Sequence, residues 1–176
     1  MEQATIIEQI TQLEAERDKL GWDQEAELLV LLRGGPLHLP QAAPLPLPPD
    51  RKPLTALARL VREVGRQHLR FPRGDEPYAV LLMAEGYGKD MTPEEQAEYE
   101  AHAPSQRLPL GDRPDAYEIR FVAAVDTGGN RYSLQRIRGE DPEPVEVDTA
   151  TDRDNVTPLL VALMGLIRSG RKPTPN

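Results

Sequence analysis

One segment, residues 117–138, constrains the fold of this chain more than any other, because two strand-like runs flank a pair of glycines. In the first run apolar side chains recur at every second position, which is the pattern of a half-buried strand. The apolar side holds Tyr117, Ile119, Phe121, Ala123 and Val125, and the other side begins with Glu118 and Arg120. Gly128-Gly129 predicts a two-residue type I′ turn, since glycine readily adopts positive φ angles. That turn places Val125 opposite Tyr132.

Length and composition predict one domain that comprises residues 1–176. A chain of this length buries roughly 70% of its unfolded surface, so it needs neither a disulfide nor a metal ion for stability. The absence of cysteine excludes disulfides, thiolate zinc sites and cysteine nucleophiles, and it is typical of a reducing cytoplasm. The net charge of −8 argues against a general attraction to nucleic acid or anionic membranes. No targeting segment is predicted, and the apolar runs are shorter than the roughly 20 residues that cross a bilayer.

The pattern of apolar residues predicts an α+β fold with a mainly antiparallel four-stranded sheet, whose apolar face is covered by amphipathic helices. We expect the strands at residues 28–32, 78–84, 117–125 and 131–138. A short helix capped by Asp23 is the alternative for the first of them. Residues 145–147 are a candidate for a further small strand at the sheet edge, where proline is tolerated.

Four helices are expected around this sheet. In the first, Ile6, Ile10 and Leu13 begin an apolar stripe that continues to Leu20, with Gly21 as the stop. This stripe favours packing on the chain's own sheet, with a weak homodimer seam as the alternative. The second helix is entered through Pro53, has its apolar residues between Leu54 and Val64 and is expected to end near Gly65 or His68. The third begins at Thr92 with a capping box. The fourth begins at Thr157-Pro158 and is ended by Gly170. Its residues 159–167 are apolar almost all round, so it is predicted to be largely buried.

A proline-rich connector occupies residues 36–53, with seven prolines in 18 residues. Such a run excludes regular helix and central strand, so we expect an extended segment. Pro44, Pro46, Pro48 and Pro49 form a candidate partner-binding motif, because polyproline II segments bind aromatic grooves. The alternative, which we favour, is a stiff crossing whose leucines cover the core. At the other end of the chain, residues 171–176 are predicted to form a frayed tail.

Arginines on the second helix form a candidate anion-binding site. Arg59, Arg62 and Arg66 recur at helical spacing, and guanidinium groups pair bidentately with phosphate or carboxylate. The acidic net charge and the lack of a glycine-rich phosphate loop argue against this use. A solvated face paired with nearby carboxylates, such as Glu63, is the favoured interpretation.

Carboxylates and histidine provide weaker candidates for metal binding and catalysis. Glu95, Glu98 and His102 lie at helical spacing, but no second motif completes a metal site, so a polar solvent face is favoured. Glu85 and Asp126 stand at expected strand ends and are the nominees for acid–base chemistry. Asp126 also suits a structural position at the hairpin, opposite Arg131. No nucleophile elbow or dinucleotide motif is present, and no cofactor is expected.

The segment from Arg113-Pro114-Asp115 through the glycine turn to Arg138-Gly139-Glu140-Asp141, together with Gly21-Trp22-Asp23, resembles small uncharacterised actinobacterial α+β proteins. The resemblance covers about a third of the chain. It implies a host group and no activity.

These patterns favour a non-catalytic interaction or accessory protein of the cytoplasm, monomeric or weakly dimeric, with a protein partner. Two alternatives remain open. One is a small enzyme with a carboxylate-based site near Glu85 or Asp126, and the other is an anion or nucleic-acid binder that uses Arg59, Arg62 and Arg66.

Overall fold

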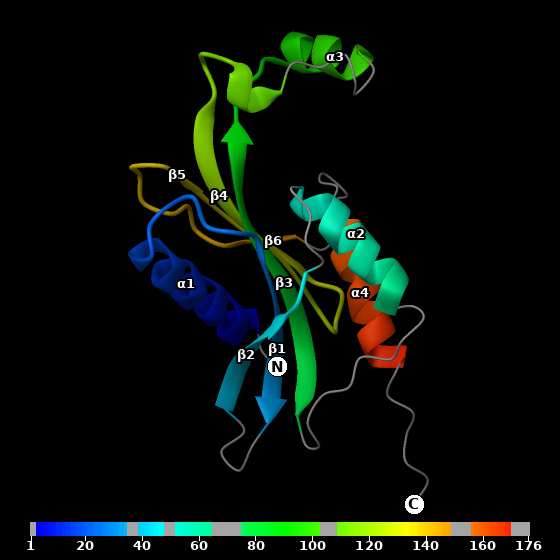
Figure 1. Cartoon of the computed structure of the whole chain (residues 1–176). Coiled ribbons are helices and arrows are strands. Elements are labelled where there is room, and N and C mark those ends of the chain that lie inside the picture. Colours follow the sequence, from blue (N-terminus) through cyan, green and yellow to red (C-terminus); the bar gives the residue numbers. More distant parts are fainter. Residues whose placement is uncertain are drawn as a thin grey trace, which may run out of the picture.

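Six strands form one antiparallel sheet in the order β2-β1-β3-β4-β5-β6 in the computed structural model (Figure 1). The structure describes residues 3–34, 39–47, 52–64, 75–102, 109–148 and 156–169. Within these residues the strands are β1 (Glu27–Gly34), β2 (Leu39–Leu45), β3 (Glu76–Gly88), β4 (Tyr117–Asp126), β5 (Arg131–Ile137) and β6 (Glu146–Asp148). The helices are α1 (Gln3–Lys19), α2 (Pro53–Val64), α3 (Pro93–Ala101), the 3-10 helix η2 (Leu110–Asp112) and α4 (Thr157–Ser169).

The α+β class and the antiparallel sheet are confirmed, but the predicted number of four strands is wrong. The additional strands are β2 and β6, which lie at the two edges of the sheet. β6 corresponds to the small edge strand that the sequence suggested. β2 lies inside the proline-rich connector, where Pro40 and Pro44 pair opposite Arg33 and Leu29 of β1. An edge strand tolerates proline because its outward-facing positions need no hydrogen-bond donor.

The sheet is buried on both faces, whereas the sequence predicted a single apolar face. Helices α2 and α4 cover one face and α1 covers the other (Figure 1). Neighbouring residues of β3 therefore contribute to different cores: Leu82 packs with Leu160 of α4, and Leu81 packs with Ile10 of α1. The first helix thus packs on its own sheet, as favoured from its apolar stripe, although Leu20 beyond its end is 67% exposed.

Helix α4 is buried along one face, which narrows the expectation of a largely buried helix. The sheet-facing residues Leu160, Leu163, Met164 and Ile167 are at most 3% exposed, while Val161 is 41% exposed. The helix covers one face of the sheet and its opposite side meets solvent. Apolar composition alone therefore overestimated its burial.

The hairpin between β4 and β5 is present, but its turn and register differ from the prediction. Asp126 pairs with Asn130 through a backbone hydrogen bond of 3.0 Å, so the loop has three residues. Among the glycines of this loop Gly129 has a positive φ, of 89°, which is the arrangement of a three-residue loop ending in a left-handed residue. The pairing is consequently shifted by one residue, and Tyr132 lies opposite Ala124 rather than Val125.

The sequence correctly predicted where α3 begins and where α1 ends. Thr92 caps α3, with its hydroxyl accepting from the Glu95 amide and the Glu95 carboxylate accepting from the Thr92 amide, which confirms the capping box. Gly21 has a φ of 86° directly after α1 and confirms the predicted stop. Asp23 caps no helix, because β1 follows as a strand.

Candidate functional site

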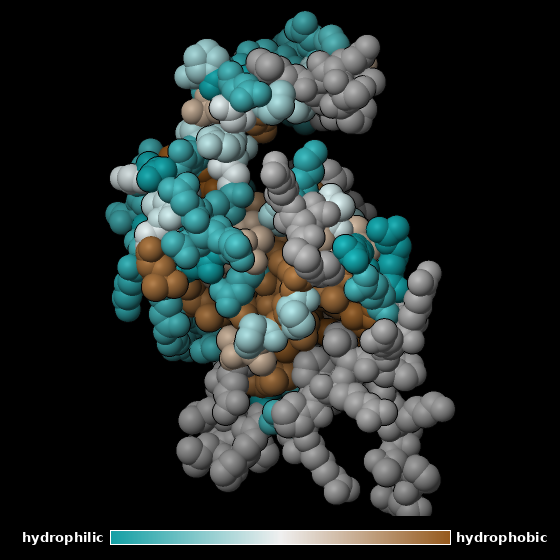
Figure 2. All heavy atoms as spheres, viewed as in Figure 1, coloured by the Kyte–Doolittle hydropathy of each residue, from teal (hydrophilic) through white to brown (hydrophobic). Residues whose placement is uncertain are grey.

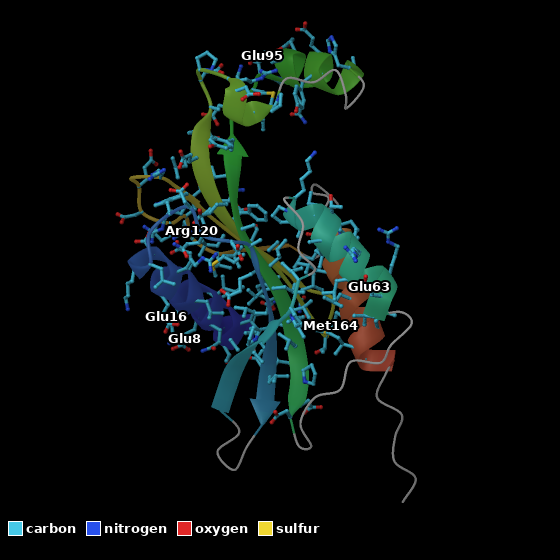
Figure 3. All side chains as sticks on the ribbon, in the orientation of Figure 1. Glu8, Glu16, Glu63, Glu95, Arg120 and Met164 are labelled. Carbon is cyan, nitrogen blue, oxygen red and sulfur yellow. The ribbon has the colours of Figure 1, made fainter. Side chains whose placement is uncertain are left out.

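The charged centre of the molecule is Arg120, a β4 residue that is 0% exposed beneath α1 (Figure 3). Its Nε and Nη2 donate to Oε1 of Glu85 at 3.0 and 2.9 Å. Its Nη1 donates to Glu14 and Asp18 of α1 at 3.3 and 3.4 Å, and Nη2 donates to the carbonyl of Gly21 at 2.6 Å. One guanidinium therefore ties α1, the following loop and β3 to the centre of the sheet.

Two further arginines and one tryptophan extend this cluster. Arg136 of β5 donates from Nε and Nη2 to the two carboxylate oxygens of Glu14, at 2.7 and 2.9 Å. The guanidinium carbon atoms of Arg120 and Arg138 lie 4.6 and 5.6 Å from the centre of the Trp22 ring. Each buried charge thus has an opposite charge within hydrogen-bond distance, which is the condition under which charges are tolerated in an interior.

Sequence reasoning placed Arg120 on the polar side of a half-buried strand and did not identify this cluster. The alternation in β4 was correct, but the side that carries Arg120 is covered by α1. The sequence did contain a signal, because Arg120 shares its side of the strand with the apolar residues Val122 and Ala124. An arginine in line with apolar residues points to a buried ion pair. We assign the cluster a structural role.

The two nominated catalytic carboxylates lie in different parts of the molecule. Glu85 belongs to the Arg120 cluster and also accepts from the backbone amide of Gln24 at 3.1 Å. Asp126 lies near the opposite end of β3, where the Thr127 amide donates to the carbonyl of Tyr78. Asp126 lies opposite Ala79, six strand positions from Glu85, which corresponds to about 20 Å, so the two carboxylates do not form one acid–base pair.

Both carboxylate oxygens of Asp126 accept hydrogen bonds that hold the β4–β5 turn in place. Oδ1 accepts from the amides of Gly128 and Asn130 at 2.8 and 2.9 Å. Oδ2 accepts from the Asn130 side-chain amide and the Tyr132 hydroxyl, both at 2.8 Å. A carboxylate with about four lone-pair positions is then fully engaged. The predicted pairing of Asp126 with Arg131 is replaced by pairing with Asn130, because the loop is one residue longer.

Two buried tyrosines make the fold sensitive to alkaline pH. Burial raises the pKa of Tyr78 to about 12, although the charge of Arg33 lowers it, and burial with the Asp126 hydrogen bond raises the pKa of Tyr132. A group whose pKa is higher in the folded state stabilises the fold fully below its unfolded pKa, about 10 for tyrosine. We therefore expect the free energy of unfolding to decrease as the pH rises from about 10 to about 12.

Urea unfolding at a series of alkaline pH values measures this decrease. Tyr78→Phe should make the decrease smaller, whereas Tyr87→Phe, at a side chain that is 50% exposed, should leave it as in the wild type. A free energy of unfolding that is constant over this range contradicts the prediction.

Some residues of the candidate anion-binding site and of the candidate partner-binding motif lie outside the described residues. Arg59 pairs with Glu63 at 3.0 Å in an exposed i, i+4 ion pair, as favoured from the sequence, and Nε of Arg62 donates to the carbonyl of Ala58. Arg66 lies outside the described residues, and the structure does not bring Arg59 and Arg62 to a common partner within the described part.

Of the proline motif, Pro44 lies in β2 and Pro46 follows it, while Pro48 and Pro49 are outside the described residues. Leu45 is buried and Leu47 packs against the core, in agreement with the expectation that leucines of this segment cover the core. The tail 171–176 is also outside the described residues. Its predicted fraying stays a prediction.

The metal candidate does not assemble. Glu95 is engaged by the capping box and by Lys89, and Nδ1 of His102 lies 2.8 Å from the carbonyl of Glu98. No group of three or more histidine, aspartate or glutamate side chains suited to a metal ion occurs among the described residues. The polar solvent face favoured from the sequence is what the helix presents.

The short polar helix that the sequence predicts from Thr92, as part of an excursion between two sheet strands, lies on an arm within residues 86–117. The described part of this arm, residues 86–102 and 109–117, projects from the body of the molecule (Figure 1). Beyond Glu85 the strands β3 and β4 continue to pair with each other, from Gly86 opposite Ile119 to Gly88 opposite Tyr117. The neighbouring strand β1 ends its pairing with β3 at Met83. α3 and η2 lie at the tip, and no residue of α3 whose burial is described is buried.

The arm is held together by contacts of its own. The Tyr87 ring packs on Gly111 and the Tyr117 ring on Gly88, where an added Cβ would come within 2.8 and 2.6 Å of the rings. Lys89 bridges Glu95 of α3 and Asp115 near the start of β4, at 3.2 and 2.7 Å. These contacts fix the position of α3 without help from the main core.

Further contacts lie at the base and the tip of the arm. The Tyr117 hydroxyl donates to Asp90 at 3.0 Å, and the Arg113 guanidinium lies 5.3 Å from the centre of the Tyr99 ring. The arm is therefore a preorganised element with a defined surface.

The arm carries a large share of the net charge. Its sequence contains seven acidic and three basic residues, a net charge of −4 out of −8 for the whole chain. Glu94 and Glu98 are exposed on α3, and in Figure 2 the described part of the arm is mostly hydrophilic on the face shown. Its described surface is thus acidic and free of large apolar patches apart from Tyr87.

Fold and surface together define an α+β protein with a two-sided antiparallel core and a projecting acidic arm. Comparison with family models, with curated proteins and with solved structures found no match to this chain. Among the residues that the structure describes, no helix has the length and apolar character that a bilayer crossing requires.

Proposed function

We propose that this protein is a non-catalytic interaction protein, which uses the arm of residues 86–117 to bind a partner protein with a basic surface. The observation that carries the proposal is the exposure of α3 along its described length, on an arm rigidified by its own contacts. A helix that is polar on all sides buries no apolar face against its own protein, so it adds little to the stability of the fold. Its presence therefore supports a role in binding another molecule. The cytoplasmic location expected from the lack of cysteine forms part of this proposal.

The charge of the arm supports a basic protein as the partner. Complementary charges steer association and select partners, and a preorganised surface loses little conformational entropy on binding. Nucleic acid and anionic lipid would be repelled by a segment of net charge −4. The exposed Tyr87 supplies an aromatic side chain of the type that is enriched at protein interfaces.

The sheet edges are less suitable for a partner. β2 carries Pro40 and Pro44, and β6 has three residues with two carboxylates, Glu146 and Asp148. Proline, short length and charge each disfavour the addition of a further strand. The separate hypothesis that Pro44, Pro46, Pro48 and Pro49 bind an aromatic groove stays a prediction, tested by replacing residues 44–49 with Gly-Ser repeats.

The test compares charge reversal on the arm with the same change on the body. Glu94→Lys/Glu98→Lys reverses two exposed charges of α3, and Glu8→Lys/Glu16→Lys reverses two exposed charges of α1 (Figure 3). Glu95 is left intact because it closes the capping box. Wild type and variants serve as baits in the lysate of the source organism, and the captured protein is then purified for direct measurement of its dissociation constant.

We expect the arm variant to bind the captured protein at least about tenfold more weakly, and the α1 variant to bind like the wild type. Raising the salt concentration should weaken the wild-type complex, since exposed charges are screened. The proposal fails if no protein is captured at low salt, or if both variants bind as the wild type does.

A further inference from the structure

A pocket of about 510 Å³ lies at the end of the sheet where β1 ends and β3 begins. Five parts of the fold meet there: the first turns of α1, the end of β1, the start of β3, the β4–β5 turn and the end of α4. The pocket is separate from the arm, since none of its described lining residues belongs to residues 86–117. It also lies apart from the Arg120 cluster, at the opposite end of β3.

Tyr78 lines this pocket because of a bulge in β3. Leu31 pairs with Ala79 and Leu32 pairs with Pro77, so Tyr78 is the extra residue of the bulged strand. A bulge redirects a side chain, and Tyr78 accordingly joins the same core cluster as its neighbour Ala79. Bulges of this kind are over-represented next to functional sites.

The Tyr78 hydroxyl is buried without a hydrogen-bond partner among the described residues. The residue as a whole is 6% exposed, and burial raises the pKa of Tyr78 to about 12. An unsatisfied buried hydroxyl has lost its hydrogen bonds to water without replacing them, so a native protein rarely keeps one without a use. The neutral hydroxyl can donate one hydrogen bond to a bound molecule.

Two arginines add positive charge to the same pocket. Arg33 lies close enough to Tyr78 for its charge to lower the pKa of that hydroxyl, and Arg168 uses one donor on the carbonyl of Thr127, at 3.0 Å. Two carboxylates also line the pocket. Asp126 is fully engaged by the hairpin, and Glu76 lies opposite Arg33 in the strand register.

We propose that this pocket binds a small organic monocarboxylate, with its carboxylate at Arg33, Arg168 and Tyr78. Arginine is suited to a planar carboxylate, which it can bind through two parallel hydrogen bonds. The two acidic residues make a single negative charge more compatible with the pocket than the double charge of phosphate.

The test uses hexanoate, its neutral analogue hexanamide, and inorganic phosphate as probes on the full-length protein. Binding is followed by chemical shifts of backbone amides, including those of Thr127, Gly128 and Asn130 beside the pocket. We expect hexanoate to bind at least about tenfold more tightly than hexanamide or phosphate, since an arginine site discriminates charge and shape. Arg33→Gln should weaken hexanoate binding by about tenfold, and Tyr78→Phe by severalfold.

Arg59→Gln on α2 is the matched control and should bind hexanoate as the wild type does. Tyr78→Phe removes an unpaired hydroxyl and keeps the ring, so it remains informative if Arg33→Gln does not fold. The proposal is overturned if hexanoate produces no shifts up to about 50 mM, if hexanamide or phosphate binds equally well, or if neither pocket variant weakens binding.

Discussion

Arg120→Ala is expected to lower the free energy of unfolding by about 3 to 5 kcal/mol, because it removes the cation from a buried ion network and leaves its partners behind. Glu14 is 1% exposed and Glu85 is largely buried, so water does not replace the lost guanidinium. Arg136 still pairs with Glu14, whereas Glu85 loses both of its arginine hydrogen bonds. Urea unfolding monitored by circular dichroism measures the change.

An exposed arginine provides the matched control for this substitution. Arg59→Ala breaks an ion pair whose side chains are 53% and 51% exposed, so the free energy of unfolding should change by less than about 1 kcal/mol. The double variant Arg120→Ala/Glu85→Ala should lose less free energy of unfolding than the two single variants lose together. It removes the carboxylate that Arg120→Ala would leave unpaired. Equal effects of Arg120→Ala and Arg59→Ala would show that the network is hydrated.

Leu160→Ala should destabilise the fold by about 2 to 5 kcal/mol, since it removes apolar contacts and leaves a cavity between α4 and the sheet. Leu160 is 0% exposed and packs in the core with Leu82 and Leu57. The shift of the urea midpoint, at an unchanged slope, measures this loss.

The adjacent residue of the same helix serves as the control. Val161 is 41% exposed, and Val161→Ala should change the free energy of unfolding by no more than about 0.5 kcal/mol, because alanine also favours helix. If the two substitutions have similar effects, α4 does not pack on the sheet by the face described.

Predictions from the sequence succeeded where the contacts that cause a feature lie within a few residues of one another. The capping box at Thr92 and the glycine stop at Gly21 rest on contacts within a few residues, and both are confirmed. The alternation in β4 correctly indicated a strand. The turn of the hairpin failed by one residue because the Asp126 side chain organises a three-residue loop, and glycine pairs are compatible with either loop length.

The sequence by itself determined the α+β class, the four helices and the main strands, since apolar periodicity and capping are properties of neighbouring residues. The tertiary structure decided which faces are buried and which side chains meet. Arg120 and Glu14 are 106 positions apart, and their contact depends on α1 covering the second face of the sheet. The Tyr78 pocket and the arm depend likewise on strand pairing between distant segments, and no local pattern encodes the register of such pairs.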